Sequence, residues 1–312
     1  MVEHPVAPKY PAASPVLAGR DEGSERGAAL LATGSALRRQ GRAAEALVVL
    51  DDARVALGSG RDVRKVGACD RLLGLTLYDL GRPQEALDRL EAARRTRVDA
   101  GPPAALAACD HDLARILLVL GRPEEALGHL RHALGGFRSV GRAAEAAVVV
   151  HNVGVVLHSL SRLDECLQAL LAARSGLGEF DRPLDVAACN VNLGVVLQDL
   201  GRGEEAIADL RQALADFRAA DRRREAATCA HVLAGALRGA GDHEGSRTAL
   251  EQARRWFADA GEPGDVDACD HALGVVQREI AEAHAAGWRG FGPAGHGVDG
   301  GPARAGLGTA PA

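Results

Sequence analysis

The chain has 312 residues and a formal net charge of -5; 47% of its residues are hydrophobic, 25% are charged and 3% are aromatic. This composition is normal for a soluble folded protein, and the low aromatic content predicts a core of Leu, Val and Ala. The absence of a long basic run argues against nucleic-acid binding, and no segment reaches the roughly 18 to 20 consecutive apolar residues of a membrane-spanning helix.

The N-terminal segment differs in composition from the rest of the chain. Residues 1–22 are rich in Pro and Ala and are expected to form a disordered tail. The segment holds no apolar run of signal-peptide length, so a cytoplasmic location is expected. Six cysteines in a chain of this length do not make a disulfide scaffold.

A 40-residue period begins after this segment. Each unit is marked by one turn residue, and positions below are counted from it. Leucine recurs at positions -4 and +9, alanine at +12, a small residue at +5, and Gly or Ala at -7. Spacings of three, four and seven residues are helical, so each unit predicts two helices that flank the turn residue. The turn residues are Gly41, Gly81, Gly121, Ser161, Gly201 and Gly241.

Turn signals separate the predicted helices. Glycine at the turn residue suits a left-handed helix C-cap, and Pro83 and Pro123 suit the start of a second helix. A closing helix is expected near 264–285, and the Gly, Ala and Pro-rich residues 287–312 are expected to form a second disordered tail. Turn-like stretches between units lie at 99–103, 179–183, 219–223 and 259–265.

The stretch NLGVVLQDLGRGEEAIADLRQAL (192–214) resembles the tetratricopeptide repeat. The resemblance covers about residues 24–280. It implies an all-α, right-handed α-solenoid of about six helix-turn-helix repeats over residues 23–286, with a C-terminal capping helix. The family's usual unit is about 34 residues, so these helices are longer, as in kinesin light chains and bacterial multidomain regulators. The family's large aromatic residues are mostly Leu here.

The stretch ACDH occurs twice, at 108–111 and 268–271, and raises the question of a metal or catalytic site. Its cysteine belongs to a column at position -12 and its histidine to a column at -10. At about 100° per residue these columns face opposite sides of one helix, so they cannot act together. The cysteines are expected in a buried seam and no metal site is expected. The role of the acidic column between them, Asp70, Asp110 and Asp270, is left open.

The resemblance implies that the first helix of each unit lines a concave groove that binds partner segments. Positions -10, -6 and -3 share one face of that helix. Either these polar residues are an ordinary solvated face, or they form a ladder of donors for a peptide; we favour the second, with pH sensitivity near neutrality if the histidines titrate there. The expected partner-binding residues are Arg71, Tyr78, His111, Arg115, His151, Asn152, His158, Asn192, Gln198, His231, Arg238, His271 and Arg278.

Motifs of common enzymes are absent from the sequence. It has no phosphate loop, HExxH, CxxC or GxSxG, and the GxGxxG at 295–300 lacks the strand and helix that would give it meaning. The favoured hypothesis is a non-catalytic adaptor or regulator that binds a peptide or protein segment without a cofactor. The first alternative is a sensor that binds a signalling peptide and acts with an effector enzyme on another chain. The second is an enzyme centred on His111 and Arg115 or on His151 and His158. The oligomeric state is left open.

Overall fold

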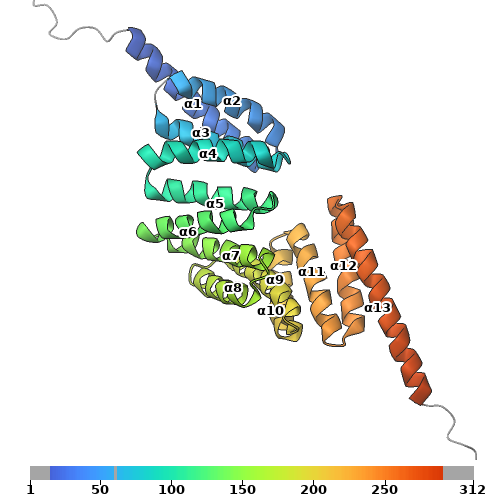
Figure 1. Cartoon of the computed structure of the whole chain (residues 1–312). Coiled ribbons are helices and arrows are strands. Elements are labelled where there is room, and N and C mark those ends of the chain that lie inside the picture. The colour runs from blue at the N-terminus through green and yellow to red at the C-terminus, as the bar shows by residue number, and fades with distance from the viewer. Residues whose placement is uncertain (1–14, 60–61, 291–312) are drawn as a thin grey trace, which may run out of the picture.

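The computed structural model describes residues 15–59 and 62–290, which form thirteen α-helices and one 3₁₀ turn and contain no strand (Figure 1). Consecutive helices pack in pairs, and the pairs stack into an α-solenoid, as predicted. The first helices of the six units are α1 (Pro15–Arg39), α3 (Val63–Asp79), α5 (Pro103–Val119), α7 (Ala143–Ser159), α9 (Pro183–Asp199) and α11 (Arg223–Gly239). The second helices are α2 (Ala43–Ser59), α4 (Pro83–Ala100), α6 (Pro123–Ser139), α8 (Leu163–Gly178), η1 (Gly203–Ala206) with α10 (Ile207–Ala219), and α12 (His243–Ala260); α13 (Pro263–Gly290) closes the array.

The two outer helices extend beyond the predicted domain bounds. The bounds at residues 22 and 286 fall inside α1 and α13. Helix α1 begins at Pro15, a residue that a helix admits in its first turn. Residues 281–290 contain four alanines and no proline, so nothing stops α13 earlier. The remaining residues of the two predicted tails, 1–14 and 291–312, lie outside the described part of the chain.

The turn residue of every unit has a left-handed backbone conformation, with φ between 57° at Ser161 and 79° at Gly241. In the second unit the Gly81 N–H donates to Tyr78 O at 2.9 Å, and the Arg82 N–H donates to Leu77 O at 2.9 Å. These bonds satisfy carbonyls that the end of α3 would otherwise leave free. Glycine adopts this conformation at little cost, whereas at Ser161 the Cβ atom crowds the following carbonyl oxygen and strains the backbone.

Four turns between units repeat the same backbone geometry. The left-handed residue stands 20 positions after the turn residue, and arginine follows it in three of the four cases. Asp181 and Asp221 adopt positive φ here without being glycine, at 51° and 52°. The turns therefore recur about every 20 residues along most of the array, although the helices repeat every 40. The four residues are Gly141, Asp181, Asp221 and Gly261.

The predicted columns form the core. Leucine at +9 and alanine at +12 are at most 2% exposed in every unit. The glycine at -7 lets the two helices of a unit approach closely: a Cβ at Gly74 would lie 2.7 Å from Leu90, and one at Gly154 would lie 2.7 Å from Leu170. Small residues in this column therefore set the spacing of the helix pair, and leucine fills the space between them.

The cysteines lie in the packing seam, as predicted. All six are free and buried. Two of the thiols donate to the second helix of the preceding unit, Cys69 to Leu50 O and Cys229 to Leu210 O, each at 3.3 Å. Burial raises the pKa of the Cys109 thiol to about 11 and that of Cys189 to about 12, so these thiols stay protonated and unreactive. No group of His, Cys, Asp and Glu in the described residues could hold a metal ion.

Candidate functional site

The acidic column between Cys and His joins neighbouring units. Asp70 and Asp110 are each 1% exposed and accept hydrogen bonds from arginines 16 residues earlier. The Nε–Oδ1 distances are 2.8 Å for Arg54–Asp70 and 2.6 Å for Arg94–Asp110. Each bond links a first helix to the second helix of the preceding unit, and Arg254–Asp270 repeats it at 2.5 Å. The acidic column is therefore structural.

The residues around this ion pair change together along the array. Where position +13 is leucine instead of arginine, position -11 of the next unit is apolar. In the unit where Asn190 replaces the aspartate, Arg174 Nη1 instead donates to Asp209 Oδ2 at 2.6 Å. Polar partners therefore occur together and apolar partners occur together, as expected for a buried contact. The apolar combinations are Leu134 with Val150 and Leu214 with Ala230.

The polar residues of the groove face mostly bond to one another. Asn152 Nδ2 donates to His111 Nε2 at 2.5 Å, and Asn192 Nδ2 donates to His151 Nε2 at 2.6 Å. Partners lie 41 residues apart because equivalent first helices are neighbours in the groove. We call these contacts inter-repeat pairs. The others are Arg71–Asp112 at 2.5 Å, Arg38–Asp79 at 2.6 Å, His158–Asp199 at 2.6 Å and Arg238–Glu279 at 3.2 Å.

The inter-repeat pairs determine how two histidines of the column at position -10 form hydrogen bonds. An amide nitrogen can only donate, so His111 and His151 accept through Nε2 as neutral imidazoles. Burial lowers the pKa of His111, His151 and His231. The pH sensitivity considered near neutrality is therefore shifted to more acidic pH. Of the three histidines weighed as catalytic, His111 and His151 bond instead to asparagines one unit further on, and His158 bonds to Asp199.

Four of the thirteen candidate residues are exposed, and the others are half-buried. The Arg115 guanidinium lies over the ring of Tyr78, 5.5 Å from its centroid, and thereby links α3 to α5. The groove thus offers exposed donors at separate points and half-buried pairs between them. The exposed residues are Arg115, Arg238, His271 and Arg278.

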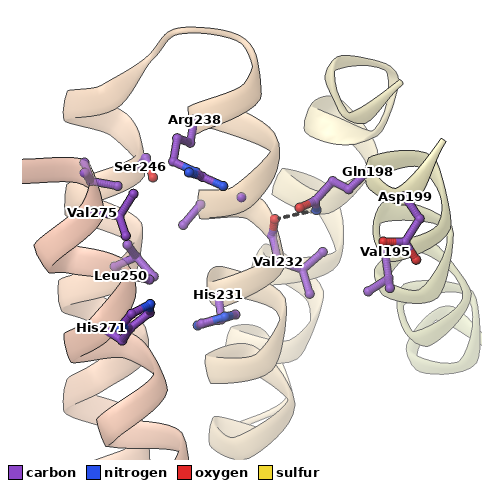
Figure 2. A pocket seen from close by; sticks show the side chains of 14 residues that line it. Val195, Gln198, Asp199, His231, Val232, Arg238, Ser246, Leu250, His271 and Val275 are labelled. Atoms are coloured by element: carbon purple, nitrogen blue, oxygen red, sulfur yellow. Dashed lines mark hydrogen bonds between the residues drawn. The ribbon is translucent and has the colours of Figure 1, made fainter. Parts of the chain in front are cut away.

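A hollow of about 420 Å³ lies on the groove face where α9, α11 and α13 meet, and we call it the C-terminal pocket. Figure 2 shows His231 on α11 and His271 on α13, with Arg238 toward the end of α11. Helix α12 contributes Ser246 and Leu250 to its lining. The other lining residues are Val195, Gln198, Asp199, Val232, Ala234, Gly235, Ala272, Val275 and Val276.

Gly235 leaves room for the side chain of Gln198. A Cβ at this position would lie 2.3 Å from Gln198 Oε1. The Gln198 side chain extends from α9 to α11, where its Nε2 donates to Val232 O at 2.9 Å (Figure 2). A second hollow of about 670 Å³ shares Gln198, Gly235 and Arg238 and extends toward the turn at 201–205. The sequence placed Gln198 and Arg238 among the expected groove residues but not Gly235. At position -6, every other unit carries a residue with a side chain.

Comparison with protein families agrees with this architecture. A family model described as tetratricopeptide repeat matches residues 68–139 and 185–257, and a second, described as tetratrico peptide repeat, matches residues 7–96. The chain belongs to the tetratricopeptide repeat (TPR) family. A comparison with curated proteins gave no match. None of the described helices is long and apolar enough to cross a membrane.

Solved structures of TPR-like proteins share the fold at low sequence identity. Aspartyl phosphate phosphatase F from Bacillus subtilis aligns with a TM-score of 0.61 and 12% identity, over 83% of this chain and 72% of that one. The Rap conjugation gene regulator of plasmid pLS20, in complex with the Phr* peptide, gives 0.57 and 17%, over 80% and 74%. The TPR-like repeats of a kinesin light chain from Podospora anserina give 0.52 and 20%, over 64% and 98%.

Proposed function

We propose that this TPR protein is a non-catalytic adaptor or regulator that binds a peptide or protein segment along the groove of its first helices. The observation that carries this proposal is the C-terminal pocket, which opens on the groove face among residues able to donate and accept hydrogen bonds. Apolar residues at position -6, such as Val155 and Val195, provide a floor for the bound segment. TPR arrays are scaffolds for protein interaction, so groove and family support the same function.

A second candidate is a sensor that binds a signalling peptide and acts with an effector enzyme on another chain. It is supported by two structural neighbours: the pLS20 regulator with its Phr* peptide, and a Rap protein complexed with Competence and Sporulation Factor. In this chain a groove ligand would contact the surface that also holds the inter-repeat pairs. Small-angle scattering separates the two functions, because a sensor changes its radius of gyration on binding and a rigid adaptor does not.

Affinity capture with the full chain as bait tests the proposal. Arg115→Glu combined with His271→Glu reverses or adds charge at two exposed groove positions, whereas Arg131→Glu reverses one exposed charge on α6, a second helix. We expect the groove variant to lose partners that the wild type and the α6 variant retain. Equal capture by all three chains would contradict groove binding. His111 and His151 are unsuitable for this test because each is half-buried and bonds to a neighbouring unit, whereas Arg115 and His271 are exposed.

A further inference from the structure

We infer that the C-terminal pocket is the anchor site of the groove and takes one uncharged aliphatic side chain, with its flanking peptide groups, from a linear segment of another protein. This inference rests on the proposed function and names the chemistry of the bound segment. Three features of the pocket carry it: a largely aliphatic lining, a buried hydroxyl without a partner, and charged rim side chains that already have partners.

The lining of the pocket is largely aliphatic around Gly235. Position -6 carries a side chain in every other unit and in α13, and valine is the commonest residue there. At Gly235 the Gln198 amide takes this place, since its Oε1 lies 2.3 Å from where a Cβ would stand. The hollow beside it is bounded by Leu250, which is 2% exposed, and by Val195, Val232 and Val275. An aliphatic side chain of a ligand would fill this hollow.

The unpartnered hydroxyl is that of Ser246. This residue lines the pocket, is 1% exposed, and its Oγ has no hydrogen-bond partner. A buried hydroxyl without a partner destabilises a fold, and a peptide N–H or C=O entering the pocket would supply one. Alanine would serve packing equally well, since it occupies this column in four of the five other units: Ala46, Ala86, Ala126 and Ala206.

The charged side chains at the rim already have polar partners. Arg238 Nη1 donates to Glu279 Oε1 at 3.2 Å, and Asp199 Oδ2 lies 2.6 Å from His158 Nε2. Gln198 Oε1, His231 and His271 are the remaining polar groups of the pocket, besides Ser246. A carboxylate or ammonium group would lose water on entry without gaining an unpaired counter-charge. Peptide groups flanking an aliphatic side chain match hydrogen-bonding groups of this kind.

The shape of the site favours a linear segment. The C-terminal pocket and the second hollow share Gln198, Gly235 and Arg238, so they adjoin along the groove. A chain anchored over Gly235 would continue toward the turn at 201–205, where the lining is charged and includes Glu204 and Glu205.

Selection from a phage-displayed library of random heptapeptides on the full wild-type chain tests the inference. We expect enriched peptides to share one uncharged aliphatic residue. Fluorescence polarisation then compares the best peptide on three variants. Gly235→Val, whose side chain would displace Gln198 into the pocket, should weaken binding about tenfold, and Ser246→Ala about fivefold, with a raised Tm. The control Gly135→Val adds the same atoms at an exposed glycine of α6 that has open space around it, and should leave affinity unchanged.

The possible outcomes separate the inference from the proposed function. Peptides that bind Gly235→Val and Ser246→Ala as well as wild type, but lose affinity with Arg115→Glu, would overturn the anchor site and leave groove binding intact. A consensus that is acidic or basic at the anchor would overturn the aliphatic occupant. Failure to enrich any peptide would contradict both. If Gly235→Val does not fold, Ser246→Ala decides, because four other units carry alanine there.

Discussion

The buried ion pair between the second and third units can be exchanged for an apolar contact that the chain itself contains. Asp110 Oδ1 lies 2.6 Å from Arg94 Nε and 2.6 Å from His129 Nδ1, and the aspartate is 1% exposed. We therefore consider the triple variant Arg94→Leu, Asp110→Val, His129→Ala. Each new residue already stands in the same column 40 residues further on, as Leu134, Val150 and Ala169.

The expected free energies differ between the single and triple variants. Removing one partner of a fully buried ion pair costs about 3–5 kcal/mol. The Arg94 side chain is 30% exposed and His129 keeps its bond to Asp110, so we expect Arg94→Leu to cost about 2 kcal/mol. The triple variant removes all three polar side chains and should lie within about 1 kcal/mol of wild type, because apolar replacement of buried ion pairs is often neutral.

The pH dependence provides a second measure. Burial raises the pKa of Asp110, but its bonds to His129 and Arg94 lower it more, so the folded pKa lies below the ordinary value. Its stabilisation is therefore complete above the unfolded pKa of about 3.9 and is lost as pH falls through the folded pKa. The triple variant should lack this contribution to acid unfolding.

Urea unfolding followed by circular dichroism gives the stabilities, at neutral pH and in acid. Hydrogen exchange of α4 and α5 should accompany it, because repeat arrays can unfold in parts. The reasoning predicts faster exchange across this interface in Arg94→Leu and near wild-type exchange in the triple variant. A triple variant as unstable as the single one would refute it.

Three other expectations follow from the same contacts. The double variant His151→Val with Asn192→Val should stay within about 1 kcal/mol of wild type, while His151→Val alone should cost about 1–2 kcal/mol. Since the folded pKa of His151 is lowered, its contribution to stability is complete above about pH 6.5 and is lost on acidification. The double variant should therefore lose less Tm than wild type between neutral and mildly acidic pH, and an equal loss of Tm would count against the pairing. Ser161→Gly should raise stability by about 1 kcal/mol by relieving the left-handed turn, and a lower Tm would show that the serine is not strained. The six buried thiols, with pKa values of about 11 to 12, should resist a disulfide reagent until the chain unfolds, whereas prompt modification would contradict their burial.

Most of the fold was predictable from the sequence because helix geometry links spacing to direction. The columns at -7, +9 and +12 identified the close helix pair, and Gly41 and its equivalents placed the turns. The outer helix ends were not predicted correctly, because Pro15 and residues 287–290 look like tail composition yet are compatible with helix. The left-handed turns at Asp181 and Asp221 were seen only as turn-like stretches.

The sequence predicted which helix face carries the candidate site, but not which residues bond to one another there. The angle between positions -10, -6 and -3 placed His111, Arg115 and Gln198 on one surface. The bond from His111 to Asn152 depends on how successive first helices sit against each other, which periodicity within one helix does not determine. The 16-residue spacing of Arg94 and Asp110 and the gap at Gly235 were visible in the columns, but they gain meaning only once neighbouring helices are in place.

The most direct test of groove binding is the dissociation constant of the most enriched captured protein for three versions of the full chain. Wild type, Arg115→Glu with His271→Glu, and the α6 control Arg131→Glu are compared by calorimetry at one salt concentration. We predict binding at least about tenfold weaker for the groove variant, a change of about 1.4 kcal/mol, and wild-type affinity for the control. Equal affinity for wild type and the groove variant, with both chains folded, would contradict binding in the groove.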